Sequence, residues 1–226
     1  KADGIIVSPI NADNVRRAID RAADVGIPVI TTDADIDGSR RTCCVSIDSA
    51  KASRIAGRLI GQFLNGQGKI AIISSAVSSE NNNYYVQMRE HGFTDFLQRE
   101  YPQVEIVFCI ESFENPQITY EKTMQLLRDE PELRGIYITC GGVAQVGRAL
   151  IESGRADSVR VLCYENYPEI VELMRQGVID WTLGGDKAQQ GALPVKLIMD
   201  ELVFGRKPAT DRIYTDTRIL VKECFA

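Results

Sequence analysis

The stretch YITCGGVAQVGRALIESG, residues 137–154, could hold a phosphate group, because glycine-rich turns between a strand and a helix often do so. Its glycine spacing fits the pattern GxxxxGK followed by Ser or Thr. However, Arg148 replaces the lysine that contacts phosphates, and Ala149 replaces the hydroxyl that holds Mg²⁺. The dinucleotide pattern GxGxxG also fails, since Gly141 and Gly142 are adjacent. The stretch therefore disfavours a nucleotide site and predicts a helix N-terminus at the carboxyl end of a strand.

Other residues that could perform catalysis or bind a metal are sparse. His91 is the single histidine, and its place in MREHGF on a predicted helix favours a surface or capping role. The chain has no CxxC pair and no G-x-S-x-G motif, and no cluster of carboxylates at helical spacing surrounds His91. We therefore expect a protein that is not an enzyme and that uses neither a metal nor a cofactor.

A different group of polar and aromatic residues follows the predicted strands. Its members combine carboxylates, hydroxyls and backbone amides with flat rings: Asp33, Ser74, Ser75, Glu111, Phe113, Gly141, Gly142, Tyr164, Glu165, Gly185 and Asp186. Loops are polar in most proteins, so any one of these residues is weak evidence. Their expected gathering at one edge favours a polyhydroxylated ligand, which donates hydrogen bonds to carboxylates and packs its apolar face on a ring.

Short runs rich in Ile and Val alternate with amphipathic stretches, and these elements must position the polar group. The apolar runs predict strands at 4–9, 27–32, 43–47, 69–75, 104–110, 135–140, 159–164, 178–184 and 218–223. The amphipathic stretches predict helices at 12–26, 48–65, 84–99, 116–128, 168–176 and 187–204, with another in the opening stretch. Such alternation predicts an α/β fold with doubly wound parallel sheets. About nine strands favour two lobes over one.

The composition disfavours several classes of function. The net charge is −5 and no run of Lys and Arg occurs, which disfavours nucleic-acid binding by this chain's own surface. No apolar run reaches the roughly 18 residues that span a bilayer, and no signal-peptide pattern opens the chain. Among the cysteines, Cys109, Cys140 and Cys163 lie at or near the ends of apolar runs, where free cysteines are often buried. We therefore expect free thiols and a cytoplasmic protein.

The order of the segments resembles a known family. The motifs ADGIIVSP, GIPVITTDADID, VSIDSAKASRIAGRLI and MREHGF precede the opening stretch, and VRVLCYENYPEIVELMRQGVIDWTLGGDKAQQG and TRILVKECFA follow it. In this order they are similar to the effector-binding core of the LacI/GalR family of transcription regulators, which has the type I periplasmic sugar-binding fold. Each motif is loose by itself, and their order is the specific signal.

The resemblance implies two lobes with a hinge, whose cleft would bind a sugar-like effector and close on it. The N-terminal lobe would contain residues 1–47 and 186–215, and the C-terminal lobe residues 48–185 and 216–226. The resemblance also implies a homodimer that binds operator DNA only through an N-terminal helix-turn-helix, which this sequence does not contain. By the same comparison, the first βαβα segment of the N-terminal lobe is expected to be missing.

Some ligand contacts are implied by matching positions. Asp33 matches a usual acceptor of sugar hydroxyl groups, and Phe113 matches an aromatic residue of the cleft. Gln87 falls where a ligand-clamping arginine usually lies, while Arg89 matches a second arginine that is often structural. The loss of the first arginine disfavours a strongly anionic ligand.

Other positions depart from the family pattern. Gly141 and Gly142 replace an Asn-Asp pair, and Tyr164 with Glu165 stands for Phe-Asp. Asp186 lies beside a glycine that replaces a hinge glutamine. Because these departures remove several polar anchors, the effector is expected to be unusual for the family.

Two classes of function fit the predicted fold. The first is the effector domain of a cytoplasmic LacI-type regulator, which controls DNA binding through lobe closure. The alternative is an extracytoplasmic solute-binding protein that delivers a sugar to a transporter or chemoreceptor. An α/β enzyme is the least favoured class, and it predicts that substitution of His91 or Glu165 abolishes turnover.

Overall fold

The computed structural model describes residues 2–9, 13–75, 84–113 and 115–225. The chain divides into two compact units: the first contains Lys1–Asp48 and Gly185–Thr217, and the second contains Ser49–Gly184 and Arg218–Ala226. The chain thus passes between units after residues 48, 184 and 217, where the sequence predicts crossovers after 47, 185 and 215. Each unit contains a parallel sheet with helices on both faces, which confirms the predicted α/β fold with parallel-sheet lobes.

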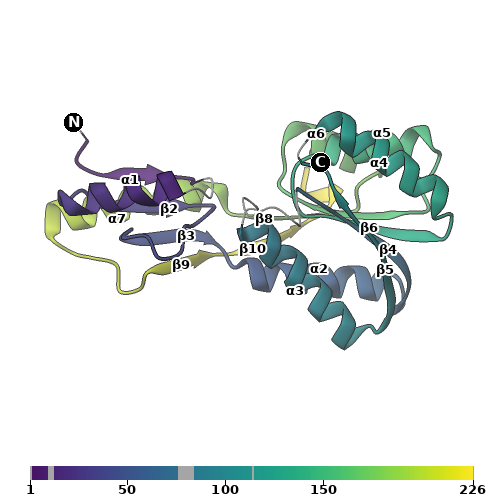
Figure 1. The fold of residues 1–226 in the computed structure, drawn as a ribbon, viewed down its shortest axis with the longest axis horizontal. Helices are drawn as coiled ribbons and strands as arrows, with labels where there is room; N and C mark the ends of the chain where they lie inside the picture. Colours follow the sequence, from purple (N-terminus) through teal and green to yellow (C-terminus); the bar gives the residue numbers. More distant parts are fainter. Residues whose placement is uncertain (1, 10–12, 76–83, 114, 226) are drawn as a thin grey trace. The chain divides into compact units, whose positions relative to one another are not determined.

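The first unit is a four-stranded parallel sheet in the order β1-β2-β3-β9 between two helices (Figure 1). Its elements are β1 (Ile5–Val7), α1 (Asp13–Asp24), β2 (Val29–Thr32), β3 (Cys43–Ile47), α7 (Lys187–Phe204) and β9 (Arg212–Thr215). Adjacent residues of β2 point to opposite faces. Val29 packs with Ile19 of α1, whereas Ile30 packs with Ile198 of α7. This alternation places one helix on each face of the sheet.

The second unit is a six-stranded sheet in the order β10-β8-β7-β6-β4-β5 (Figure 1). Its strands are β4 (Gln67–Ser74), β5 (Gln103–Glu111), β6 (Leu133–Ile138), β7 (Arg160–Tyr164), β8 (Trp181–Gly185) and β10 (Thr217–Leu220). Its helices are α2 (Ser49–Phe63), α3 (Tyr84–Glu100), α4 (Pro116–Asp129), α5 (Val143–Glu152), α6 (Pro168–Arg175) and the 3-10 helix η1 (Lys222–Phe225). The pairs from β8 through β5 are parallel.

Both faces of the six-stranded sheet are buried. Ile138 and Val161 pack with apolar residues of α4, α5 and α6 on one face. On the other face, Phe93 of α3 stacks on Tyr137 of β6 with ring centroids 4.1 Å apart. Burial on both faces explains why these strands are continuously apolar rather than alternating. Because the strands are parallel, their carboxyl ends share one edge, where the predicted ligand-binding loops begin.

Three strand predictions differ from the structure. The sequence does not predict β9, since RIYT has only four residues and Tyr214 is exposed. β8 begins at Trp181 rather than residue 178, because Val178 and Ile179 join the core before the strand starts. The last predicted strand, 218–223, ends at Leu220 and is followed by η1.

Candidate functional site

Backbone strain gathers where strands end. Among the described residues other than glycine, positive φ angles occur at Asp33 (64°), Asn65 (54°), Phe113 (51°) and Glu165 (75°). Asn65 lies just past α2, at the kind of position where Asn commonly takes this conformation. The other three follow β2, β5 and β7 at their carboxyl ends. All three belong to the predicted ligand-binding set, and strained backbone of this kind clusters at ligand sites.

Asp33 begins the loop between β2 and β3, residues 33–42, in the first unit. Its side chain is exposed, while its amide donates a hydrogen bond of 3.1 Å to the Val45 carbonyl. The next amide, of Ala34, donates to the Thr32 carbonyl at 2.7 Å. These bonds hold the Asp33 backbone on the end of the sheet, so its carboxylate is presented to solvent from a defined position.

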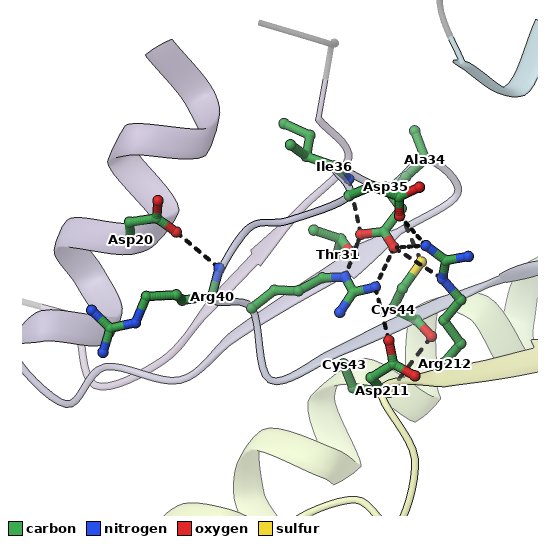
Figure 2. Close-up of polar contacts among 12 residues, drawn as sticks. Asp20, Thr31, Ala34, Asp35, Ile36, Arg40, Cys43, Cys44, Asp211 and Arg212 are labelled. Carbon is green, nitrogen blue, oxygen red and sulfur yellow. Dashed lines mark hydrogen bonds and ion pairs between the residues drawn. The ribbon is translucent and has the colours of Figure 1, made fainter. Parts of the chain in front are cut away.

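A buried carboxylate anchors the same loop (Figure 2). Asp35 accepts hydrogen bonds from the Thr31 hydroxyl at 2.8 Å and from the Ile36 amide at 2.9 Å. It also pairs with the guanidinium groups of Arg41 and Arg212. Burial by itself would raise the pKa of Asp35, but the hydrogen bonds and charge from Arg41, with the bond from Thr31, hold this pKa below its ordinary value. Asp35 is therefore a charged, fully engaged anchor.

Phe113 presents an aromatic ring after β5. Its side chain is 56% exposed, and its amide donates to the Ser75 carbonyl after β4. The Lys122 ammonium lies 5.8 Å from the centre of the Phe113 ring. Just beyond, Asn115 caps α4 by accepting hydrogen bonds from two amides of its first turn. An exposed ring on a restrained backbone is suited to pack against the apolar face of a sugar.

Glu165 follows β7 and is half-buried. Its amide donates to the Leu183 carbonyl of β8 at 2.9 Å, and the Thr182 hydroxyl donates to its carbonyl. These bonds fix the backbone of Glu165 at the carboxyl edge of the six-stranded sheet. Glu165 thus lies at the sheet edge where the other predicted ligand-binding loops of this unit begin.

Tyr164 corrects one prediction, because its ring is not available as an exposed flat face. The side chain is 4% exposed, and its hydroxyl lies 2.7 Å from the hydroxyl of Tyr137. The Arg89 guanidinium lies 3.8 Å from the centre of the Tyr164 ring, and Arg89 also donates to the Thr139 carbonyl at 3.0 Å. Burial raises the pKa of both tyrosines, so the hydroxyl pair stays neutral. Tyr164 and Arg89 therefore form a buried contact at the end of β7.

Gly142 has a backbone role that the sequence comparison does not predict. It precedes α5 with φ of 93°, and no side chain caps that helix at its N-cap. A Cβ atom at Gly142 would lie 2.8 Å from the Thr119 methyl carbon, which is too close. Glycine is therefore required for the turn itself, and its value as evidence for an unusual ligand is reduced. Gly141 beside it is exposed.

Of the two remaining predicted residues, one lies on a helix and the other immediately precedes one. Gln87 is half-buried in α3. Asp186 is the N-cap of α7, and its carboxylate accepts the Gln189 amide at 3.0 Å. Capping of this kind stabilises a helix by about 1 kcal/mol. A structural role for Asp186 is thus established, and its role in ligand binding stays a prediction.

Sequence reasoning missed the anchor of the Asp33 loop. Arg41 is near Asp35 in the chain, but Arg212 is 177 positions away, and β9, which carries Arg212, was not predicted. One signal was present: Thr31 and Asp35 flank Asp33 symmetrically in TTDAD. Only the parallel pairing of β3 with β9 brings Arg212 to this loop.

Cysteine burial follows the prediction only in part. Cys43, Cys44 and Cys163 are buried, whereas Cys109 is exposed and Cys140 is intermediate. Cys109 is exposed because β5 is the edge strand of its sheet. None of the six cysteines forms a disulfide.

Among the residues with described positions, no metal-ligand cluster occurs and no helix has the length and apolar character needed to cross a bilayer.

Comparisons with known proteins agree with this geometry. The family described as "Periplasmic binding protein domain" matches residues 1–207. The chain is 22% identical over 218 residues to the D-allose-binding periplasmic protein of Escherichia coli (strain K12), covering 92% of this chain and 68% of that protein. It is also 22% identical over 225 residues to a D-ribose/D-allose-binding protein of Pseudomonas aeruginosa, covering 93% and 66%. The chain thus spans about two thirds of the length of these curated relatives.

Solved structures share the fold. The glucose-galactose binding protein GanP of Geobacillus stearothermophilus is 27% identical with a TM-score of 0.86, covering 99% of this chain and 78% of that one. A putative LacI transcriptional regulator of Bacteroides fragilis is 19% identical with a TM-score of 0.84, covering 99% and 76%. The fold is therefore shared by sugar-binding proteins and by at least one regulator.

Proposed function

The chain belongs to the periplasmic binding protein domain family, and from this premise we propose that it binds a sugar or related polyol as an extracytoplasmic solute-binding protein. In this role it delivers the sugar to a transporter or chemoreceptor. The observation that carries the proposal is the set of strained residues Asp33, Phe113 and Glu165 at the strand ends. Their carboxylates and ring are the groups that recognise a polyhydroxylated ligand.

Each of these residues has a separate chemical task in the proposal. In the first unit, Asp33 accepts hydrogen bonds from sugar hydroxyls, and in the second unit Glu165 is the candidate acceptor. Phe113 packs its exposed ring against the carbon–hydrogen face of the sugar. The uncapped N-terminus of α5 presents backbone amides that donate to a sugar oxygen. Binding involves no covalent step, so no catalytic residue is required.

The relatives favour this role over regulation. Two curated relatives bind D-allose or D-ribose by name, one of them in the periplasm. GanP, at 27% identity, binds glucose or galactose by name. These names do not agree on one sugar, so the proposal stays at the level of neutral sugars.

The direct test is a binding screen with D-allose, D-ribose, D-glucose, D-galactose and D-arabinose. We expect one of them to raise the melting temperature at millimolar concentration, because a ligand that binds only the native state stabilises it by mass action. ATP serves as the control and should produce no shift. No shift with any neutral sugar contradicts the proposed function.

Asp33→Ala then tests the site residue itself. Loss of a hydrogen bond to a charged acceptor should weaken calorimetric binding of the selected sugar by about 1.5–3 kcal/mol, without loss of the fold. Asp216→Ala is the matched control, since Asp216 is an exposed aspartate that follows β9 of the same sheet. Equal affinity of Asp33→Ala and the unchanged protein removes Asp33 from the site.

A second candidate is the effector domain of a cytoplasmic LacI-type regulator. The likeness to the regulator of Bacteroides fragilis and the six free cysteines favour it. This candidate adds a homodimer and operator DNA bound through a separate headpiece. Thiol titration of the denatured, unreduced protein distinguishes the two candidates. Disulfides in the protein isolated from its native host contradict the regulator, and a helix-turn-helix encoded upstream contradicts the solute-binding protein.

A further inference from the structure

Asp35 is a buried carboxylate two residues beyond Asp33 (Figure 2). Its side chain is 1% exposed, and its hydrogen-bond donors come from β2, from two residues of the loop itself and from the start of β9. These donors are Thr31, Ile36, Arg41 and Arg212. Asp35 thus ties the loop at residues 33–42 to two strands of the first unit, β2 and β9.

The guanidinium groups make this anchor rigid. Arg41 reaches both oxygens of Asp35 through two of its nitrogens, and its side chain is 7% exposed. Arg212 lies 3.1 Å from Asp35 and also pairs with Asp37, so the start of β9 holds the loop at two points. A two-point contact of this kind fixes orientation as well as distance.

Asp33 needs such support. Its φ of 64° is a conformation that persists only where the surrounding structure holds it. One residue, Ala34, separates it from Asp35, and the Ala34 carbonyl lies 4.0 Å from the Cys44 sulfur of β3. A shift of Asp35 would therefore be transmitted directly to the Asp33 backbone.

We propose that Asp35 is a positioning residue for Asp33, and that its ion pairs with Arg41 and Arg212 set the affinity of the sugar site. The inference rests on the proposed function, in which Asp33 accepts sugar hydroxyl groups. A hydrogen-bond acceptor in a binding site must be held within about 0.5 Å of the position that binds the ligand. A residue on a loop depends on supporting contacts to hold that position. A buried ion pair often stabilises a fold no more than apolar residues of similar size would, so stability alone does not account for this cluster.

The first test needs no sugar. Asp35→Asn removes the charge that pairs with both arginines, while Arg212→Gln removes only the partner whose side chain is 29% exposed. Hydrogen exchange should become about tenfold faster at the amides of residues 33–36 in both variants. Peptides from β4 and β6 in the second unit should not change. Arg212→Gln keeps the test decisive if Asp35→Asn does not fold.

Asp20→Asn is the matched control for the loop. Asp20 of α1 accepts the Arg40 amide at 2.8 Å and so holds the same loop at its other end (Figure 2). This variant should leave exchange at residues 33–36 unchanged. If it accelerates exchange there as much as Arg212→Gln does, the loop moves as a whole and Asp35 has no specific role.

The second test measures D-allose and D-ribose binding by calorimetry in a double-mutant cycle. Arg212→Gln should weaken binding about tenfold in the otherwise unchanged protein, and less than about twofold when Asp33 is already Ala. The difference arises because the effect of Arg212 passes through Asp33. A merely structural contact gives the same loss in both backgrounds, and that result overturns the proposal.

The outcomes separate the two claims. If neither sugar binds the unchanged protein, the role in D-allose or D-ribose recognition fails, and the exchange data alone decide whether Asp35 positions the Asp33 loop. If a sugar binds but exchange at residues 33–36 is unchanged in both variants, the positioning role is wrong and the proposed function stands.

Discussion

At the residue scale, Gly142 illustrates how a backbone requirement can resemble a lost ligand contact. Its φ of 93° and the closeness of Thr119 leave room for no side chain. By comparison, Gly154 has φ of 68°, and a Cβ atom at that position would have no neighbour within 4 Å, so only its conformation restricts substitution. Substitution at Gly142 therefore involves both steric conflict and backbone strain, whereas substitution at Gly154 involves backbone strain alone.

Gly142→Ala should lower the free energy of unfolding by about 2–4 kcal/mol, from strain plus conflict with Thr119. Gly154→Ala should cost only about 1–2 kcal/mol, from strain. Thr119→Ser removes the conflicting methyl group and should restore part of the loss when combined with Gly142→Ala. Urea denaturation measures all of these variants. Equal losses for the two glycine substitutions would show that Thr119 does not constrain the turn.

At the element scale, the hydroxyl pair of Tyr137 and Tyr164 joins β6 to β7 beneath the strand-end loops. Tyr137→Phe should cost about 1 kcal/mol of stability, because the Tyr164 hydroxyl loses a buried partner. The double variant with Tyr164→Phe should cost less than the sum of the single variants, since it leaves neither hydroxyl in the pair. Denaturant titration of the three variants measures the coupling. Simple additivity means that the hydroxyl contact contributes nothing.

Surroundings within the sheet also control the reactivity of the cysteine thiols. Cys109 is an exposed residue on the edge strand, but burial around its thiol group and the nearby Glu90 carboxylate raise the pKa of this thiol to about 12. Burial raises the pKa of Cys163 to about 12 as well. Because the thiolate is the reactive form, Cys224 should react first with a disulfide reagent at pH 8, followed slowly by Cys109.

Peptide mapping of the labelled protein measures this order. Cys163 should react only after unfolding, since its side chain is 0% exposed. If Cys109 reacts as fast as Cys224, its thiol is hydrated and the predicted slow reaction is wrong.

At the scale of the whole molecule, we expect the two units to respond differently to acid. The folded-state pKa of Asp35 lies below the unfolded value, so the stabilisation it provides is complete above the unfolded pKa. This stabilisation of the first unit is lost as the pH falls through the lowered, folded-state pKa. Burial raises the pKa of Asp180 in the second unit, so its protonation on acidification favours the folded state instead.

We therefore expect the first unit to unfold at higher pH than the second during acid titration. Trp181, the single tryptophan, lies in β8 and reports on the second unit, while far-UV circular dichroism reports on both. The dichroism signal should begin to fall before the Trp181 fluorescence changes. Coincident transitions would mean that the units unfold together and that Asp35 does not set the acid limit.

Local pattern was sufficient for most of the fold. The apolar runs and amphipathic stretches predicted the alternation of strands and helices, because a strand buried on both faces must be continuously apolar and a helix covering it must have one apolar face. The same pattern placed Asp33, Phe113 and Glu165 at strand ends. β9 escaped prediction because a strand of four residues with an exposed Tyr214 has no such pattern.

The sequence by itself thus determined the fold class and the chemical types at the carboxyl edges, since both follow from local periodicity. Tertiary structure alone decided which of these groups are available. It buried Tyr164 against Arg89, committed Asp186 to a helix cap and made Gly142 a steric necessity. It also brought Arg212 to Asp35 across 177 positions of sequence, because parallel pairing of β3 with β9 is a long-range contact that no local pattern encodes.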